Sequence, residues 1–185
     1  MTLLQLSLAL LALLLTPGPT NTLLAVAGIE RGFRAGLRLV PAEVAGYLAT
    51  TLPLALFGAA VMDDLPGARA VLTGIAALWV LWLAYQMWQR RPEAAQGGVT
   101  GRRVFVTTLL NPKALIIGLI LLPAAGVLWQ GAALFVGLIA VVAALWAALG
   151  AGLVRTGSAP RLLRRGAAVW LALLSAGLAV KAMAG

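Results

Sequence analysis

Six stretches of apolar residues, each long enough to cross a lipid bilayer as a helix, dominate this sequence. A helix rises ~1.5 Å per residue, so roughly 20 residues cross the ~30 Å hydrocarbon core of a membrane. The predicted spans cover residues 3–29, 39–62, 68–88, 104–128, 132–154 and 166–184. Polar or turn-rich segments separate them, including Gln130-Gly131 between the fourth and fifth. The sequence therefore predicts an all-α integral membrane protein with one polytopic domain over residues 1–185.

The composition excludes several other classes of protein. Of the 185 residues, 62% are hydrophobic and 10% are charged, whereas soluble domains are ~45–50% apolar and ~25% charged. A short chain cannot hide that much apolar surface in a water-soluble core. Cysteine and histidine are absent, which removes disulfides, thiol chemistry and the usual zinc ligands. We therefore predict no metal, no cofactor and no catalytic residues.

The basic residues predict the orientation of the chain. They outnumber the acidic ones by 14 to 5, but the arginines gather in short loops between spans, which is typical of membrane orientation and not of nucleic-acid binding. The loops after spans 1, 3 and 5 contain Arg31, Arg34, Arg38, Arg90, Arg91, Arg102, Arg103, Arg155, Arg161, Arg164 and Arg165. The positive-inside rule places these loops in the cytoplasm and both termini outside, in a bacterial cytoplasmic membrane.

The first span is interrupted by helix-breaking residues. Pro17, Gly18 and Pro19 remove backbone donors and weaken the helix, and Asn21 follows them. Counted back from the cytoplasmic loop, Asn21 lies on the order of 13 Å deep, near the middle of the bilayer. Backbone groups freed there need partners from protein or from water in a cavity, because lipid offers none. A structural kink is the alternative interpretation of the two prolines.

The fourth span is interrupted in a similar way by Asn111, Pro112 and Lys113. Lys113 lies on the order of 15 Å deep, where a charge costs ~2.5–3.5 kcal/mol and needs a partner or a wet cavity. A structural ion pair is the alternative to a functional role. The breaks fall in the first span of each three-span half, which predicts a 3+3 inverted repeat whose broken helices 1 and 4 meet near the midplane.

The residues at the two breaks predict a substrate-binding site. Half-helices that restart at Pro19 and Pro112 would direct unpaired N–H groups, and the positive ends of their dipoles, into a cavity. Such ends bind carboxylates, and Lys113 adds a full positive charge. Asn21 and Asn111 can each donate and accept hydrogen bonds. This set favours a zwitterion such as an amino acid, with its carboxylate at Lys113 and its ammonium at carbonyl and amide oxygens.

Glu43 is the acidic residue inside a predicted span. It lies on the order of 7 Å below the cytoplasmic surface. Burial away from water favours the protonated carboxyl group, which makes Glu43 a candidate for proton coupling. It could equally reach the membrane interface, or pair with Arg38 or Lys113.

Three glycines at four-residue spacing, Gly28, Gly32 and Gly36, follow the first break. Such spacing permits helices to approach closely. Because part of this run falls in the predicted loop over residues 30–38, tight turning is the simpler interpretation.

At these residues the chain resembles the LysE/RhtB family of amino-acid exporters. The similar positions are Pro17, Gly18, Pro19 and Asn21, then Gly28, Gly32, Gly36 and Gly46, and then Asn111, Pro112, Lys113, Ala114 and Pro123. The resemblance implies a six-span exporter of amino acids or related metabolites, driven by the proton-motive force, that forms a homodimer. A channel, an exporter of another solute and a structural membrane subunit are the other functions that broken apolar helices allow.

Overall fold

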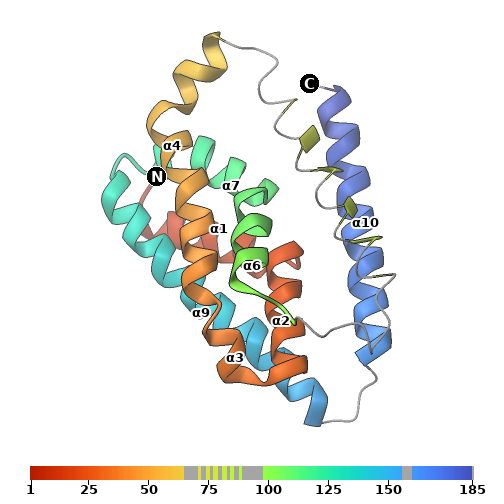
Figure 1. The fold of residues 1–185 in the computed structure, drawn as a ribbon. Coiled ribbons are helices and arrows are strands. Elements are labelled where there is room, and N and C mark those ends of the chain that lie inside the picture. The colour runs from red at the N-terminus through yellow and green to blue at the C-terminus, as the bar shows by residue number, and fades with distance from the viewer. Residues whose placement is uncertain are drawn as a thin grey trace.

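The computed structural model describes residues 1–64, single positions between 71 and 88, and residues 98–155 and 160–184. The elements over these residues are all helical, which confirms the predicted class (Figure 1). They are α1 (Leu3–Leu15), α2 (Pro19–Arg31), α3 (Phe33–Leu37), α4 (Val40–Asp64), α6 (Gly101–Leu109), α7 (Pro112–Ile116), the π-helix η2 (Ile117–Leu121), α8 (Leu122–Ala124), α9 (Leu128–Arg155) and α10 (Pro160–Ala184).

Within these ranges, two continuous helices have the length and hydropathy to cross a membrane, over Phe33–Gly58 and Leu128–Leu153. Two bent pairs, Leu3–Leu15 with Pro19–Arg31 and Gly101–Leu109 with Pro112–Ala124, raise the number to four if each pair is one span. Predicted span 3 lies largely outside the described residues. The prediction of six spans in an inverted repeat therefore stays a prediction.

The first predicted break is confirmed as a bend of 61° between α1 and α2. Proline disfavours the helical conformation in the residue before it. Thr16, before Pro17, and Gly18, before Pro19, are accordingly extended, with ψ of 129° and 176°. Pro19 then occupies the first turn of α2, where its missing N–H removes no helical hydrogen bond.

The second predicted break is confirmed as a bend of 47° between α6 and α7. Asn111, before Pro112, is extended with ψ of 123°. The predicted end of this span is wrong, however. The chain turns at Gly126, whose φ of 68° favours glycine, and Gln130 and Gly131 lie inside α9.

Close approach of α2 and α3 to α9 explains two glycines that were predicted to be turn residues. A Cβ on Gly28 would lie 2.3 Å from the Ala147 carbonyl oxygen, and one on Gly36 would lie 2.5 Å from the Ala147 Cβ. Gly32, with φ of 81°, does form a tight turn. The predicted loop is reduced to this joint between α2 and α3 and to the turn after α3 that begins at Arg38. From α9, a Cβ on Gly150 would lie 2.0 Å from the Ala25 carbonyl oxygen.

Helix α4 packs along both halves of the second broken pair (Figure 1). A Cβ on Gly46 would lie 2.7 Å from the Phe105 carbonyl oxygen in α6, and one on Gly118 in η2 would lie 2.9 Å from the Thr51 carbonyl oxygen in α4. Glycine therefore allows backbone to meet backbone on both sides of the bend.

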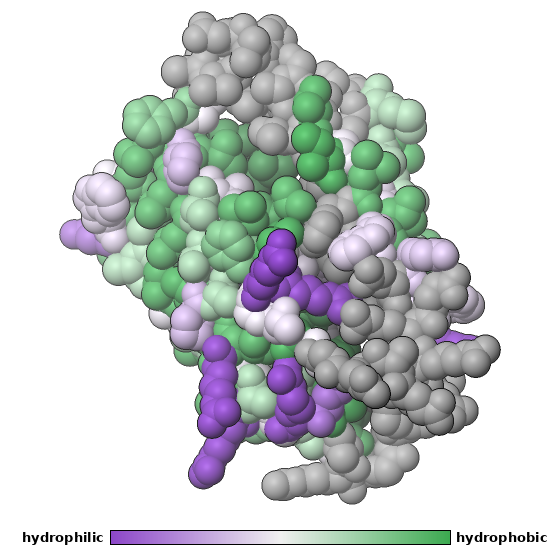
Figure 2. All heavy atoms as spheres, viewed as in Figure 1, coloured by the Kyte–Doolittle hydropathy of each residue, from purple (hydrophilic) through white to green (hydrophobic). Residues whose placement is uncertain are grey.

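The described surface is largely apolar, as a lipid-facing surface requires. Side chains such as Leu4, Phe57, Trp129 and Leu149 are exposed. Figure 2 shows mainly hydrophobic side chains in the upper half of the coloured surface, while hydrophilic side chains lie at the centre of the face and toward the end where α3 lies.

Candidate functional site

The two helix breaks meet in the interior, and Lys113 joins them. Its side chain is buried, and its ammonium donates hydrogen bonds to the carbonyl oxygen of Leu14, at 3.3 Å, and to that of Thr16. Both acceptors lie at the end of α1, where the last carbonyl groups of a helix lack helical partners and carry partial negative charge. Lys113 thus obtains the buried partners that an intramembrane charge requires.

Asn21 donates to the same two carbonyl groups. Its Nδ2 lies 2.7 Å from the Leu14 oxygen and 3.1 Å from the Thr16 oxygen. A carbonyl oxygen has two lone pairs, so each of these acceptors can serve both donors. The amide of Asn21 therefore caps the end of α1 from the first turn of α2, across the bend.

Asn111 stabilises the second break through hydrogen bonds of its side chain. Its Oδ1 accepts from the backbone N–H of Lys113 at 3.1 Å and so caps α7. Its Nδ2 lies 3.2 Å from Thr20 Oγ1 and 3.3 Å from the Tyr47 hydroxyl. We predicted that the start of α7 offers unpaired backbone N–H groups. This prediction is wrong for the N–H of Lys113, because the side chain of Asn111, the N-cap residue, accepts its hydrogen bond.

The start of α2 differs from the start of α7. Gly18 is its N-cap residue and makes no side-chain hydrogen bond to the helix. Of the two predicted helix ends, this is the one that lacks a side-chain cap. Pro17, in the same connection, presents a carbonyl oxygen that accepts from the indole N–H of Trp170 at 3.1 Å.

Glu43 lies inside the protein, with an exposed fraction of 2%. Its carboxyl group is therefore enclosed by the protein. Its Oε2 is buried without a hydrogen-bond partner. Tyr47 follows Glu43 by one helical turn in α4. A buried carboxyl oxygen without a hydrogen-bond partner is energetically costly.

Four residues at the site were missed by sequence reasoning: Thr20, Tyr47, Thr108 and Trp170. The hydroxyls of Thr20 and Thr108 are 3.1 Å apart and join α2 to α6. The Tyr47 ring packs edge-on against Phe135, with 5.4 Å between centroids. Two signals in the sequence could have indicated most of them. Thr20 and Thr108 are polar residues close to the breaks, and Tyr47 follows Glu43 by four residues within one apolar span.

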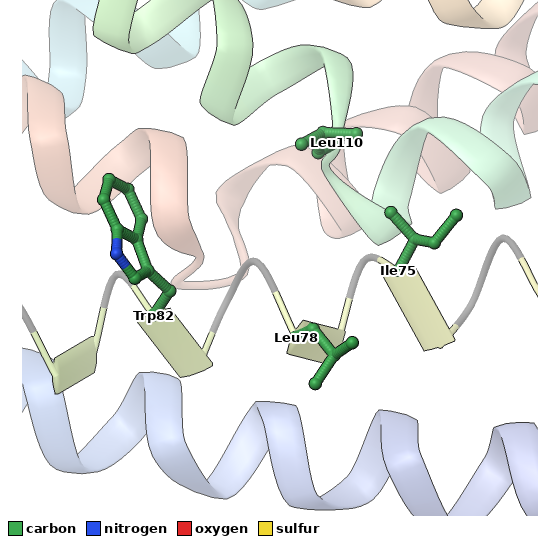
Figure 3. A pocket seen from close by; sticks show the side chains of 4 residues that line it. All are labelled: Ile75, Leu78, Trp82 and Leu110. Carbon is green, nitrogen blue, oxygen red and sulfur yellow. The ribbon is translucent and has the colours of Figure 1, made fainter.

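An open apolar pocket of about 380 Å³ lies beside the second break. Ile75, Leu78, Trp82 and Leu110 line it, and Leu110 directly precedes Asn111 (Figure 3). Figure 3 shows Leu110 on the connection after α6, across from Ile75 and Trp82.

We expect Thr50→Val to destabilise the protein by about 1–2 kcal/mol, because Thr50 Oγ1 donates at 2.9 Å to the carbonyl oxygen of Leu109 at the end of α6. That oxygen would lose a donor next to the break. The matched control is Thr51→Val. Thr51 donates at 2.8 Å to Tyr47 within its own helix, so its loss should matter less. Thermal unfolding in detergent compares the two, and equal losses would contradict the prediction.

Apolar helices with two broken pairs that meet at buried polar groups occur in many membrane transporters. Part of the chain is similar to curated proteins named cysteine/O-acetylserine efflux protein from Salmonella typhimurium, Salmonella typhi and Salmonella choleraesuis. In each case 36% of residues are identical over 75 residues, which are 40% of this chain and 37% of the relative. This similarity confirms the resemblance to LysE/RhtB-type exporters. No family profile matches the chain, and no solved structure matches it.

Proposed function

We propose that this protein is a secondary-active exporter of amino acids, or of related small metabolites, across a bacterial cytoplasmic membrane. The observation that carries the proposal is the meeting of both broken helices at Lys113, buried beside Asn21 and Asn111. Discontinuous helices that meet around buried polar groups form the substrate sites of many transporters. The names of the similar proteins include cysteine and O-acetylserine, which are both zwitterionic amino acids.

The predicted substrate-binding residues remain Pro17, Gly18, Pro19, Asn21, Asn111, Pro112 and Lys113. The uncapped start of α2 offers backbone donors for a carboxylate, and Lys113 offers a positive charge. Asn111 acts here mainly by fixing the second break, since its side chain already serves α7, Thr20 and Tyr47.

The topology in the membrane is part of the proposal. We expect six spans in two inverted halves, both termini outside, and a homodimer. A tag at the C-terminus that is accessible only from the cytoplasm would contradict this orientation, because the basic loops would then face outward against the positive-inside rule.

The test is uptake of a labelled amino-acid mixture into proteoliposomes that contain the purified protein, with and without an imposed pH gradient. Saturable accumulation that depends on the gradient is the expected result. Flux that does not saturate and follows only the solute gradient would indicate a channel. No flux from folded protein would favour another solute or a structural role.

Proton coupling through Glu43 gives a separate prediction. Glutamine preserves the size of the side chain but cannot gain or lose a proton, so Glu43→Gln should still move substrate down its own gradient while losing accumulation driven by pH. The measurement is the ratio of uptake with and without the pH gradient, which should fall to about one. A variant that responds to the gradient as steeply as the wild type would exclude Glu43 as the coupling group.

A further inference from the structure

At the end of α1, the carbonyl oxygens of Leu14 and Thr16 accept hydrogen bonds from the ammonium of Lys113. Lys113 follows Leu14 by 99 residues in the sequence. The last carbonyl groups of a helix attract cations. The lysine reaches them from another broken helix, and its side chain is buried. This arrangement binds a primary ammonium group, which in this structure is the ammonium of Lys113.

We propose that the Leu14 and Thr16 carbonyl groups form the subsite for the substrate's ammonium group, and that Lys113 occupies this subsite until a substrate replaces it. The inference rests on the proposed function and assigns part of its binding site. It restricts the substrate to small zwitterions with a primary ammonium group and a carboxylate.

The exchange conserves charge and hydrogen bonds. A primary ammonium carries the same charge as the lysine Nζ and the same three donors, so it can replace Nζ at both carbonyl groups. The displaced Lys113 then pairs with the carboxylate of the same molecule, as a charge-assisted hydrogen bond. A zwitterion adds no net charge to the buried site. A simple cation would add a second positive charge next to Lys113. A simple anion has no ammonium group, so it could not replace the hydrogen bonds that Lys113 gives to the carbonyl groups.

Two neighbours allow Lys113 to leave. Asn21 donates to both carbonyl groups, at 2.7 and 3.1 Å, so neither is left without a partner. Gly18 lies directly against the end of the lysine side chain: a Cβ there would be 3.2 Å from Cε and 3.3 Å from Nζ. Because Gly18 has no side chain, its backbone can lie close to the end of the lysine. A small incoming ammonium group would meet no side chain there.

The experiment removes the lysine ammonium and offers the subsite a small substitute. Lys113→Met and Lys113→Gln are purified in detergent, and their thermal unfolding is measured with methylammonium chloride or with tetramethylammonium chloride at the same concentration. Tetramethylammonium has the same charge but no N–H to donate. We expect methylammonium alone to raise the unfolding temperature of both variants, by about 3–6 °C at a tenfold excess over its dissociation constant. The wild type should show no such difference, because its own ammonium occupies the carbonyl groups.

Three results would overturn the inference. The first is an equal effect of the two cations on the variants, and the second is an equal preference for methylammonium in the wild type. The third is failure of both variants to fold, because Lys113 would then be a structural cap that cannot leave despite Asn21. None of these results depends on transport. If the wild type accumulates amino acids in proteoliposomes while the cation test fails, the proposed function stands and the subsite is rejected.

Discussion

Gly150→Ala is expected to destabilise the fold severely, although alanine in a helix usually stabilises by about 0.5–1 kcal/mol relative to glycine. The added Cβ would lie 2.0 Å from the Ala25 carbonyl oxygen and 2.9 Å from the Ala25 Cα. These atoms belong to the backbone of α2, which cannot move aside as a flexible side chain can. Overpacking of this kind costs typically 1–3 kcal/mol, and more where whole helices must separate.

The control for this prediction lies two residues along the same helix. A Cβ on Gly152 meets nothing within 4 Å, and Gly152 is exposed. Gly152→Ala should therefore keep or slightly raise the thermal unfolding temperature in detergent, while Gly150→Ala lowers it by several degrees or prevents purification. If the two variants unfold at the same temperature, the close contact of α2 and α9 is wrong.

Lys113→Ala should reduce transport by roughly 10- to 100-fold. A hydrogen bond to a charged group contributes about 1.5–3 kcal/mol, and each 1.4 kcal/mol is a factor of ten. Because the lysine is expected to hold the substrate carboxylate, its loss should weaken substrate binding. The measurement is initial uptake by proteoliposomes at several substrate concentrations, with folding checked by size-exclusion chromatography.

The chain contains one further lysine, Lys181, which lies near the end of α10. Lys181→Ala removes the same charge and the same side chain at a position far from both breaks in the sequence, and should transport like the wild type. Full transport by Lys113→Ala in folded protein would remove Lys113 from the binding site. The cap at Leu14 and Thr16 would then be its whole role.

Proline and glycine made the positions of both breaks predictable, because they act on the local backbone. Thr16 and Asn111 are extended for the same reason: each precedes a proline. The partners of Lys113 were not predictable, because Leu14 lies 99 residues away and no local rule selects it. We predicted that Lys113 binds a substrate carboxylate, whereas in this structure its ammonium donates to carbonyl groups of the chain itself.

Glycines show the same division between local and distant causes. Gly32 turns the chain and could be predicted from the loop around it. At Gly28 and Gly36 no larger side chain fits, because Ala147 in α9 lies against both. That contact joins segments far apart in the chain, so it could not be predicted from the sequence around the glycines. Tyr47 was missed for a similar reason, since its hydroxyl becomes part of the site only when α4 lies beside Asn111.

The dependence of Lys113 on the end of α1 also has a consequence for biosynthesis. Synthesis proceeds from the N-terminus, so the carbonyl groups of Leu14 and Thr16 are made about a hundred residues before the lysine that they stabilise. A nascent α6–α7 segment entering the membrane alone would carry an unpaired charge into lipid. Its insertion is therefore expected to wait for docking against α1. Shortened chains that begin after Gly18 should be retained at the insertion machinery and degraded, even though every later apolar stretch is intact.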